Sequence, residues 1–139
     1  MSDPFALIQA RLEAAPILAG KVRDTALTPA GEVFQGNYLL LFMSANPDEL
    51  VTERQSRSAQ ADDDADWVFT VRAVAVDTDG ARMLARAAFS QLVGWAPSLV
   101  GRTFSKVSHD GAEPVREDTT LKPSLFFAED DYSVRSWRA

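Results

Sequence analysis

The spacing of hydrophobic and polar residues at the start of the chain changes from helical to extended. Apolar residues recur every three or four positions between Pro4 and Pro16, which predicts a short amphipathic helix with one buried face. Residues 21–25 predict a short strand. Residues 37–44, NYLLLFMS, are apolar at both parities, and this is typical of a strand that is covered on both faces.

A long polar segment separates that strand from the next one. Residues 46–66 combine charged and small residues without periodicity, so we expect a long loop or the tip of a hairpin. After it, residues 67–76, WVFTVRAVAV, place apolar side chains on one face while Thr70 and Arg72 interrupt the other. This segment should pair with residues 37–44 across the loop.

A second helix follows. It is predicted to begin at Asp77 or Thr78, which can cap it, and to end at Gly94. Its apolar residues form one broad stripe, whereas Arg82 and Arg86 fall on the other side. The helix should therefore lie across the sheet.

The last part of the chain carries large aromatic residues almost to its end. Residues 100–109 predict a weaker strand, and residues 110–123 are rich in turn formers. The chain then ends in SLFFAEDDYSVRSWRA, residues 124–139, where Phe126 and Phe127 are expected to complete the core. The acidic cluster EDD in this segment is predicted to be a turn or a bulge between two strand segments.

The order helix, strands, helix, strands predicts an α/β (α+β) fold. We expect a single domain over residues 1–139, with a mostly antiparallel or mixed sheet and two main helices packed on one face. A length of 139 residues is enough for a core that needs no metal or disulfide. With 46% hydrophobic and 24% charged residues, disordered and fibrous classes are excluded.

Charge and cysteine content narrow the possible functions. The formal net charge of -6 argues against a protein that coats DNA, because non-specific affinity for nucleic acid comes from basic surfaces. There is no cysteine, which excludes disulfides, thiol catalysis and cysteine-type zinc sites. The chain has no signal-peptide pattern and no apolar run of membrane-spanning length, so we expect no contact with a membrane.

The sequence lacks the common catalytic motifs GxGxxG, GxxxxGK[ST], GxSxG and HExxH. His109 is the only histidine and has no nucleophile fixed beside it, so we expect a solvated or capping residue and no enzymatic activity. Asp62, Asp64 and Asp66 have the spacing that opens a calcium loop. The sixth position is Trp67 instead of glycine, however, and the twelfth is not glutamate. We therefore predict no metal and no cofactor.

Three consecutive segments carry a resemblance to a known family. They are WVFTVRAVAVDTDGARMLARAAFSQLVGWAP, GRTFSKVSHDGAEPVREDTT and PSLFFAEDDYSVRS. In the order and residue character of these segments, the chain from about Asn37 onward resembles the tail terminator (tail completion) proteins of long-tailed bacteriophages. That family has an N-terminal helix, a strand pair with a polar loop, a strand that runs into a helix ending near Gly-Trp, and a closing aromatic-acidic strand.

The resemblance implies a structural role in the virion. Members form a homohexameric ring on the tail tube, stop its polymerisation and present the surface on which the filled head docks. The implied partners are other copies of the chain, the tail tube protein and the head-tail connector or stopper protein, with DNA passing through unbound. The implied location is the head-proximal end of the tail, after assembly in the host cytoplasm. An acidic inner wall would not retain phosphates.

Two regions are the candidate contact sites. The chain end is expected to be a strand with a partner, in its own sheet or on another chain, because aromatic residues near a chain end need one. As an edge strand, it is the candidate to extend the sheet of a neighbouring subunit or to pack into its groove. The long loop is the candidate contact with the tube or lining of the lumen. The predicted interface residues are Tyr132, Val134, Arg135 and Trp137, and the predicted loop residues are Arg54, Arg57, Asp62, Asp63, Asp64 and Asp66.

Two alternatives remain open from the sequence. One is a head-tail connector or head-closure protein, which also forms rings of small subunits. The other is a small enzyme or ligand-binding domain with a pocket under the helix, although the acid, base and cofactor motifs of such a domain are missing.

Overall fold

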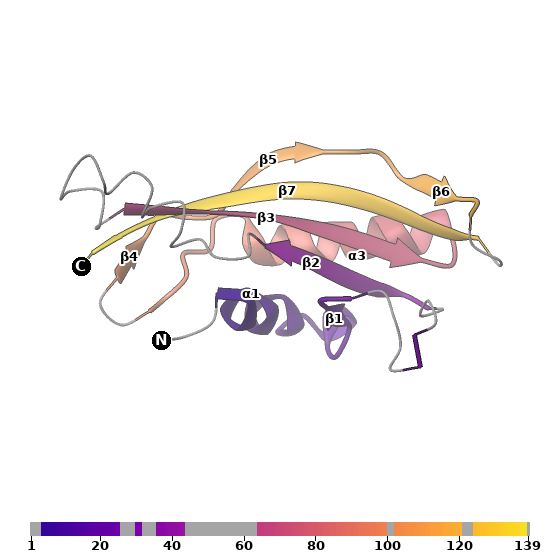
Figure 1. Cartoon of the computed structure of the whole chain (residues 1–139), viewed down its shortest axis with the longest axis horizontal. Helices are drawn as coiled ribbons and strands as arrows, with labels where there is room; N and C mark the ends of the chain where they lie inside the picture. The colour runs from indigo at the N-terminus through magenta and orange to yellow at the C-terminus, as the bar shows by residue number, and fades with distance from the viewer. Residues whose placement is uncertain are drawn as a thin grey trace.

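The protein is a two-layer α+β structure, with helices packed against one twisted sheet (Figure 1). The computed structural model describes residues 4–25, 30–31, 36–43, 64–99, 102–120 and 124–138. The helices are α1 (Pro4–Glu13) and α3 (Thr78–Leu92), with a short 3-10 turn, η1, at Pro16–Leu18. The strands are β1 (Val22–Arg23), β2 (Tyr38–Met43), β3 (Asp64–Ala75), β4 (Arg102–Phe104), β5 (Ser108–Ala112), β6 (Arg116–Asp118) and β7 (Leu125–Arg138).

The sheet is mixed, as predicted, and its strands follow the order β1-β2-β3-β7-β4. Among the described strands, β1 and β2 alone pair in parallel, and the predicted pairing of β2 with β3 is confirmed and is antiparallel. β7 pairs with β3 on one flank and with β6, β5 and β4 in succession on the other. The longest strand of the sheet therefore lies in its interior.

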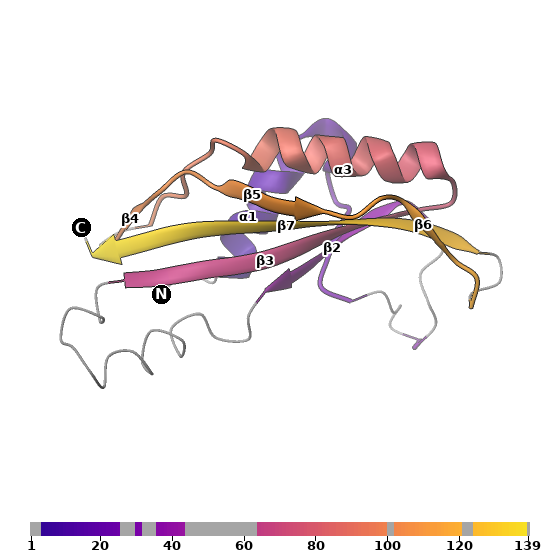
Figure 2. The ribbon, with the colours of Figure 1, turned by 90° about the horizontal axis from the view of Figure 1, so that it is seen from above.

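One face of the sheet packs against both helices to form the main core (Figure 2). Alternation along each strand selects the residues that face the helices: Leu39 and Leu41 on β2, five residues of β3, and Tyr132 and Val134 on β7. On β3 these five are Trp67, Phe69, Val71, Ala73 and Ala75. The helices contribute Ile8, Leu12, Ala81, Leu84, Ala88 and Leu92. The predicted core face of residues 67–76 is confirmed.

Local chemistry fixes the start and the end of α3. The Asp77 side chain accepts a hydrogen bond of 2.6 Å from the Gly80 amide, which satisfies one of the free amides at the helix start. Gly94 follows the last turn with φ of 84°, a conformation that glycine adopts without steric cost. Both predicted boundaries agree with the structure.

β7 contradicts the prediction of two segments separated by a turn or bulge. Glu129, Asp130 and Asp131 lie in the middle of one continuous strand. The bulge lies instead on the partner strand β5, between His109 and Gly111. The three carboxylates do not break the strand because each finds a partner on another strand.

These partners lie on both flanks and both faces of β7. Glu129 pairs with Arg72 at 3.2 Å, and Thr70 donates a hydrogen bond of 2.6 Å to Asp131. Asp130, on the helix side, contacts the ring of His109. Such long-range partners cannot be read from local sequence.

The predicted loop is also shorter than expected, because β3 begins at Asp64 and already includes Asp66. Their place in an extended strand is incompatible with a calcium loop. The other predicted loop residues, Arg54, Arg57, Asp62 and Asp63, lie outside the described residues.

Candidate functional site

The helix-free side of the sheet has an exposed end that we call the open face. It comprises Phe42 on β2, Val68 and Thr70 on β3, and Asp131, Ser133, Arg135 and Trp137 on β7. Val68, Phe42 and Trp137 are 49%, 40% and 37% exposed, respectively. Exposed apolar side chains that form a contiguous patch are typical of surfaces that contact other macromolecules.

Strand register joins the two regions that the sequence had singled out separately. Trp137 lies opposite Asp64, and Arg135 lies opposite Asp66, across the antiparallel β3–β7 ladder. Asp64 and Asp66 have the parity of Val68 along β3, so these positions belong to the same face of the sheet. Two positions of the predicted loop and two of the predicted interface thus lie opposite each other in one ladder.

The four predicted interface residues lie on both faces of the sheet, because side chains alternate along β7. Tyr132 and Val134 are 0% and 3% exposed and belong to the main core of their own subunit, so their assignment to an interface was wrong. The premise was also wrong, because β7 has backbone partners on both flanks and is not an edge strand. Arg135 and Trp137 are exposed, and their role in an interface stays a prediction.

Phe126 and Phe127 fall on opposite faces. Phe126 packs against the main core, whereas Phe127 packs against a second cluster on the helix-free side, formed by Tyr38, Leu40, Val74 and Leu125. The expectation that both complete the core of the subunit is confirmed. The second cluster covers one end of the helix-free side and leaves the open face at the other end.

An aromatic and ionic network connects that cluster to the open face. The Arg72 guanidinium lies 5.2 Å from the ring of Phe42 and 5.1 Å from the ring of Phe127, which are favourable cation–π distances. It also forms the ion pair with Glu129, and Arg116 contributes a second cation 3.6 Å from Glu129. The network holds the side chains that border the open face in fixed positions.

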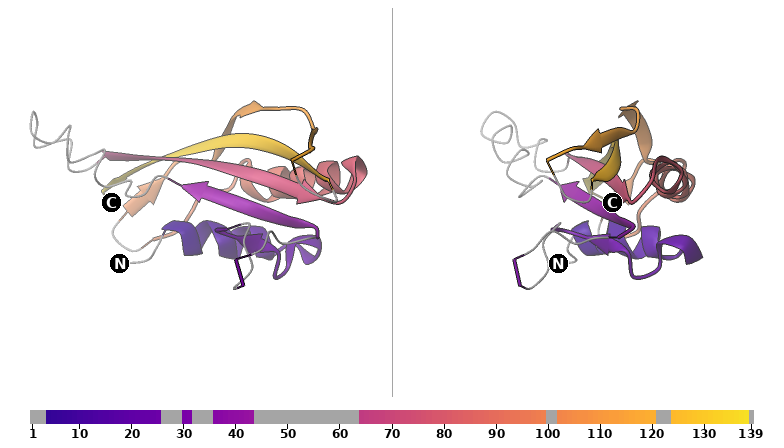
Figure 3. Two further views of the ribbon diagram at one scale, coloured as in Figure 1. Left: turned by 45° about the vertical axis from the view of Figure 1, so that its right-hand side comes forward. Right: turned by 90° about the vertical axis from the view of Figure 1, so that its right-hand side faces the viewer.

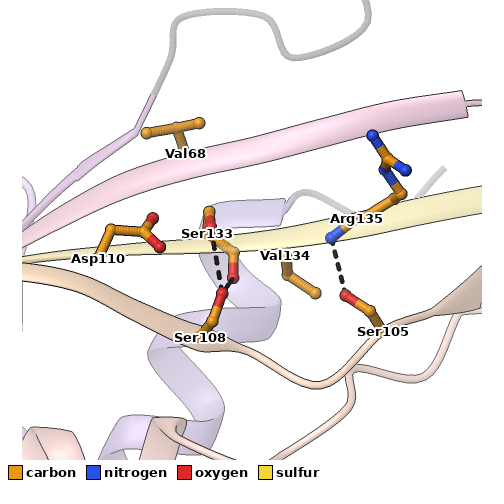
Figure 4. Close-up of a pocket in the computed structure, with 7 residues that line it drawn as sticks. All are labelled: Val68, Ser105, Ser108, Asp110, Ser133, Val134 and Arg135. Carbon is orange, nitrogen blue, oxygen red and sulfur yellow. Dashed lines mark hydrogen bonds between the residues drawn. The ribbon is translucent and has the colours of Figure 1, made fainter.

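Residues 105–107, which join β4 to β5, are not a strand, and a hollow lies beside them and the open face (Figure 4). Val107 pairs instead with the end of the helix layer, because its amide donates to the Trp95 carbonyl at 2.8 Å and its carbonyl accepts from the Gly94 amide at 3.2 Å. Ser105 fills part of the gap, since its hydroxyl accepts a hydrogen bond of 3.0 Å from the Arg135 amide.

The hollow has a volume of about 420 Å³ and is lined mainly by small polar side chains. The hydroxyls of Ser108 and Ser133 lie 3.3 Å apart, and Asp110 and Arg135 stand at opposite ends (Figure 4). The hydroxyls satisfy one another and backbone groups. This arrangement provides a polar rim for the open face and no activated nucleophile.

His109 lies on the helix side of β5, with its Nε2 2.9 Å from the Asp130 carboxylate. Its ring makes edge contacts with Phe89 and Tyr132, each at 5.2 Å between centroids. Within the described residues no hydroxyl hydrogen-bonds this imidazole, so it lacks the nucleophile that a catalytic histidine activates. His109 is a packed and paired residue, not the solvated or capping one that the sequence indicated.

Tyr132 is a fully buried residue of the helix-covered face. Its ring stacks on Phe69 at 5.6 Å, and its hydroxyl has no hydrogen-bond partner among the described residues. Burial, and to a smaller degree the Asp130 carboxylate, raise the pKa of Tyr132 well above its usual value of 10.0. The neutral phenol is therefore the form that the folded protein holds.

The described residues contain no group of three or more histidine and acidic side chains suited to hold a metal ion. Over the same part of the chain, no helix combines the length and the apolar character needed to cross a membrane.

The sequence signal for the open face was weak but present. Val68 is an apolar residue on the parity that Thr70 and Arg72 occupy, and Phe42 lies on the parity opposite to Leu41 within an all-apolar strand. Neither residue stands out without the register that brings them together.

No protein-family model matches the chain, and no curated protein matches it either. Among solved structures, it is similar to a chain described as "Virion of native gene transfer agent (GTA) particle". The TM-score is 0.69, with 17% sequence identity, and the match covers 98% of this chain and 95% of that chain. The protein therefore shares its fold, over nearly its whole length, with a component of a virion particle.

Proposed function

We propose that the protein is a structural component of a phage-like virion and that it forms a ring with copies of itself. The observation that supports this proposal is the fold that 98% of this chain shares with a chain of a virion particle. The open face supports it, because an exposed surface with Phe42, Val68 and Trp137 needs a macromolecular partner.

Within the virion, we propose the role of tail terminator, as the resemblance to that family implies. A homohexameric ring would cap the tail tube, stop its polymerisation and join it to the head-tail connector. DNA would pass through the ring without specific binding, which the net charge of -6 per chain favours. The proposal assigns the protein no catalytic step.

The first test is the mass of the purified protein by native mass spectrometry, with negative-stain images of the same sample. We expect a six-fold ring with a central hole. A twelve-fold ring would favour a head-tail connector, the alternative structural role. A protein that stays monomeric up to the highest attainable concentration would contradict both ring proposals.

The terminator role has its own test in the length of assembled tubes. The wild-type protein should stop the growth of the tail tube protein at a set length in vitro. We expect the variant Arg54→Glu/Arg57→Glu to keep the wild-type melting temperature and to lose capping, because these arginines are proposed to meet the tube. Tubes of normal length with this variant would contradict the assignment of these residues.

A further inference from the structure

Aromatic rings and arginines alternate across the helix-free side of the sheet, where β2, β3, β7 and β6 lie side by side (Figure 3). In this order the four strands contribute Phe42, Arg72, Phe127 and Arg116. The Arg116 guanidinium lies 5.0 Å from the centre of the Phe127 ring, and Arg72 lies over both rings. We call these four side chains the cation–π row. It connects Phe42, on the open face, to the opposite flank of the sheet.

Three side chains hold Arg72 in place. Besides the two aromatic rings, it contacts the Glu129 carboxylate at 3.2 Å, directly across the β3–β7 ladder. Arg116 lies 3.6 Å from the same carboxylate and pairs with Glu113 at 2.6 Å. A planar guanidinium that lies over aromatic rings and also forms an ion pair is fixed in both position and orientation.

One donor of Arg72 lacks an acceptor in this arrangement. Its Nε is buried and has no hydrogen-bond partner among the described residues, although a side chain that is 36% exposed has water within reach. A buried donor without a partner lowers stability. The rings and Glu129 therefore hold Arg72 in an orientation that hydrogen bonding alone would not select. Local violations of this kind are typical of sites that serve a function.

The side chain that this arrangement restrains on the surface is Phe42, which is 40% exposed. An exposed side chain that rotates freely loses conformational entropy when a partner immobilises it. The Arg72 guanidinium, 5.2 Å from the centre of the Phe42 ring, restricts that rotation before any contact forms. Val68, which is 49% exposed, lies diagonally across the β2–β3 ladder on the same face. Phe42 and Val68 thus form a preordered apolar contact.

The charges around Phe42 indicate a protein partner. Arg72 and Arg116 are both paired with carboxylates, and Asp131 adds a negative charge in the same rank of the sheet as Phe42. A surface without an excess of positive charge does not hold the phosphates of nucleic acid. In the ring of the proposed function, the protein that meets this surface is a second copy of the chain.

We propose that Arg72 is a positioning residue for the contact between subunits: it holds the Phe42 ring in the orientation in which a second copy of the chain binds it. Arg72 acts through Phe42 and need not touch the neighbouring subunit. This role rests on the proposed ring-forming function and deepens it, because it names the residue that prepares the contact surface.

The test compares Arg72→Ala with Arg116→Ala, each alone and together with Phe42→Leu. Arg116→Ala is the matched control, because it removes a guanidinium from the same row and from the same carboxylate while the contact of Arg72 with Phe42 stays. Phe42→Leu removes the ring and keeps an apolar side chain, so assembly remains measurable. Cooperative thermal unfolding establishes that each variant is folded, and Arg72→Gln replaces Arg72→Ala if that variant unfolds.

Two measurements are made on each protein. Sedimentation velocity gives the protomer concentration at which half of the protein is assembled. Fluorine NMR of a 4-fluorophenylalanine label at position 42, in the variants that keep the ring, reports the surroundings of that ring at concentrations below assembly.

We expect Arg72→Ala to raise the midpoint concentration about three- to tenfold, which corresponds to immobilising one more side chain at each contact, and Arg116→Ala to change it less than about twofold. Together with Phe42→Leu, Arg72→Ala should have no further effect, because the side chain through which it acts is gone. The fluorine signal should move toward that of the free amino acid in Arg72→Ala and should stay in place in Arg116→Ala.

An equal effect of Arg72→Ala with and without the Phe42 ring would show that Arg72 influences assembly by another route, and would overturn the positioning role. An unchanged midpoint or an unchanged fluorine signal in Arg72→Ala would also overturn it, but would leave the ring itself standing. A wild-type protein that stays monomeric contradicts the ring and the positioning role together.

Discussion

The two faces of the sheet differ sharply although they share every strand. Phe69 is 1% exposed and stacks on Tyr132 beneath the helices, whereas its neighbour Val68 is 49% exposed on the open face. The same contrast separates Leu41, at 2%, from Phe42, at 40%. The helix-covered face buries its large apolar side chains within the subunit, and the open face leaves Val68 and Phe42 partly exposed.

The largest expected difference between the two faces is in stability. Phe69→Ala should lower the free energy of unfolding by about 3–5 kcal/mol, because it removes a fully buried ring and leaves a cavity under the helices. Val68→Ala should change it by no more than about 0.5 kcal/mol, since that side chain is half exposed. Urea denaturation followed by circular dichroism measures both values.

Phe69 and Val68 are adjacent in the same strand, so both variants test the same local strand and differ in the face that the side chain occupies. Similar losses for both variants would mean that the open face is covered within the subunit, and would remove the basis for an exposed contact surface.

The second expected effect is a loss of stability at alkaline pH that originates on the helix-covered face. Because the pKa of Tyr132 is raised in the folded state, its contribution is complete below pH 10.0 and is lost as the pH rises above that value. The free energy of unfolding should fall by up to about 1.4 kcal/mol per pH unit in this range. Tyr38 on the helix-free side, whose pKa burial also raises, adds to the loss.

Tyr132→Phe is the matched variant for this measurement. It should remove the Tyr132 part of the alkaline loss and should raise stability at neutral pH by about 1 kcal/mol, because the buried hydroxyl has no partner among the described residues. An unchanged alkaline profile would show that Tyr132 does not carry the effect.

A smaller effect is expected from the ion pair that borders the open face. Glu129→Gln should cost about 1 kcal/mol, because the Arg72 guanidinium, packed between two aromatic rings, loses its charged partner in a half-buried site. The loss should shrink in high salt. The measurement is chemical denaturation at low and high ionic strength.

The control for this variant is the exposed ion pair of α3. Asp79→Asn removes the partner of Arg82, whose side chain is 60% exposed, and should cost only about 0.3 kcal/mol. Equal losses at the two sites would mean that the environment of Arg72 gives its ion pair no additional strength.

Much of the fold could be predicted from the sequence because its main elements have strong local patterns. The alternation of residues 67–76 identified the core face of β3, and Asp77 and Gly94 located the two ends of α3. These features depend on neighbours a few positions apart, which is the range over which periodicity and capping act.

The course of β7 could not be predicted because partners distant in sequence decide it. Three adjacent carboxylates are typical of a turn, and only the tertiary contacts of Arg72, His109 and Thr70 make a continuous strand favourable there. The same limit applies to the open face, since register alone brings Arg135 opposite Asp66. The exposed positions were partly identified, but Tyr132 and Val134 were placed on the wrong side of their strand.

The pairing of β7 on both flanks also has a mechanical consequence. Its last residues, Ser136 to Arg138, are held by β4 on one side, while β3 continues along the other side as far as Trp137. A force that pulls the chain end along the strand axis loads many backbone hydrogen bonds in parallel, in shear, instead of opening them one after another. A C-terminal end of the strand anchored in this way can bear tension.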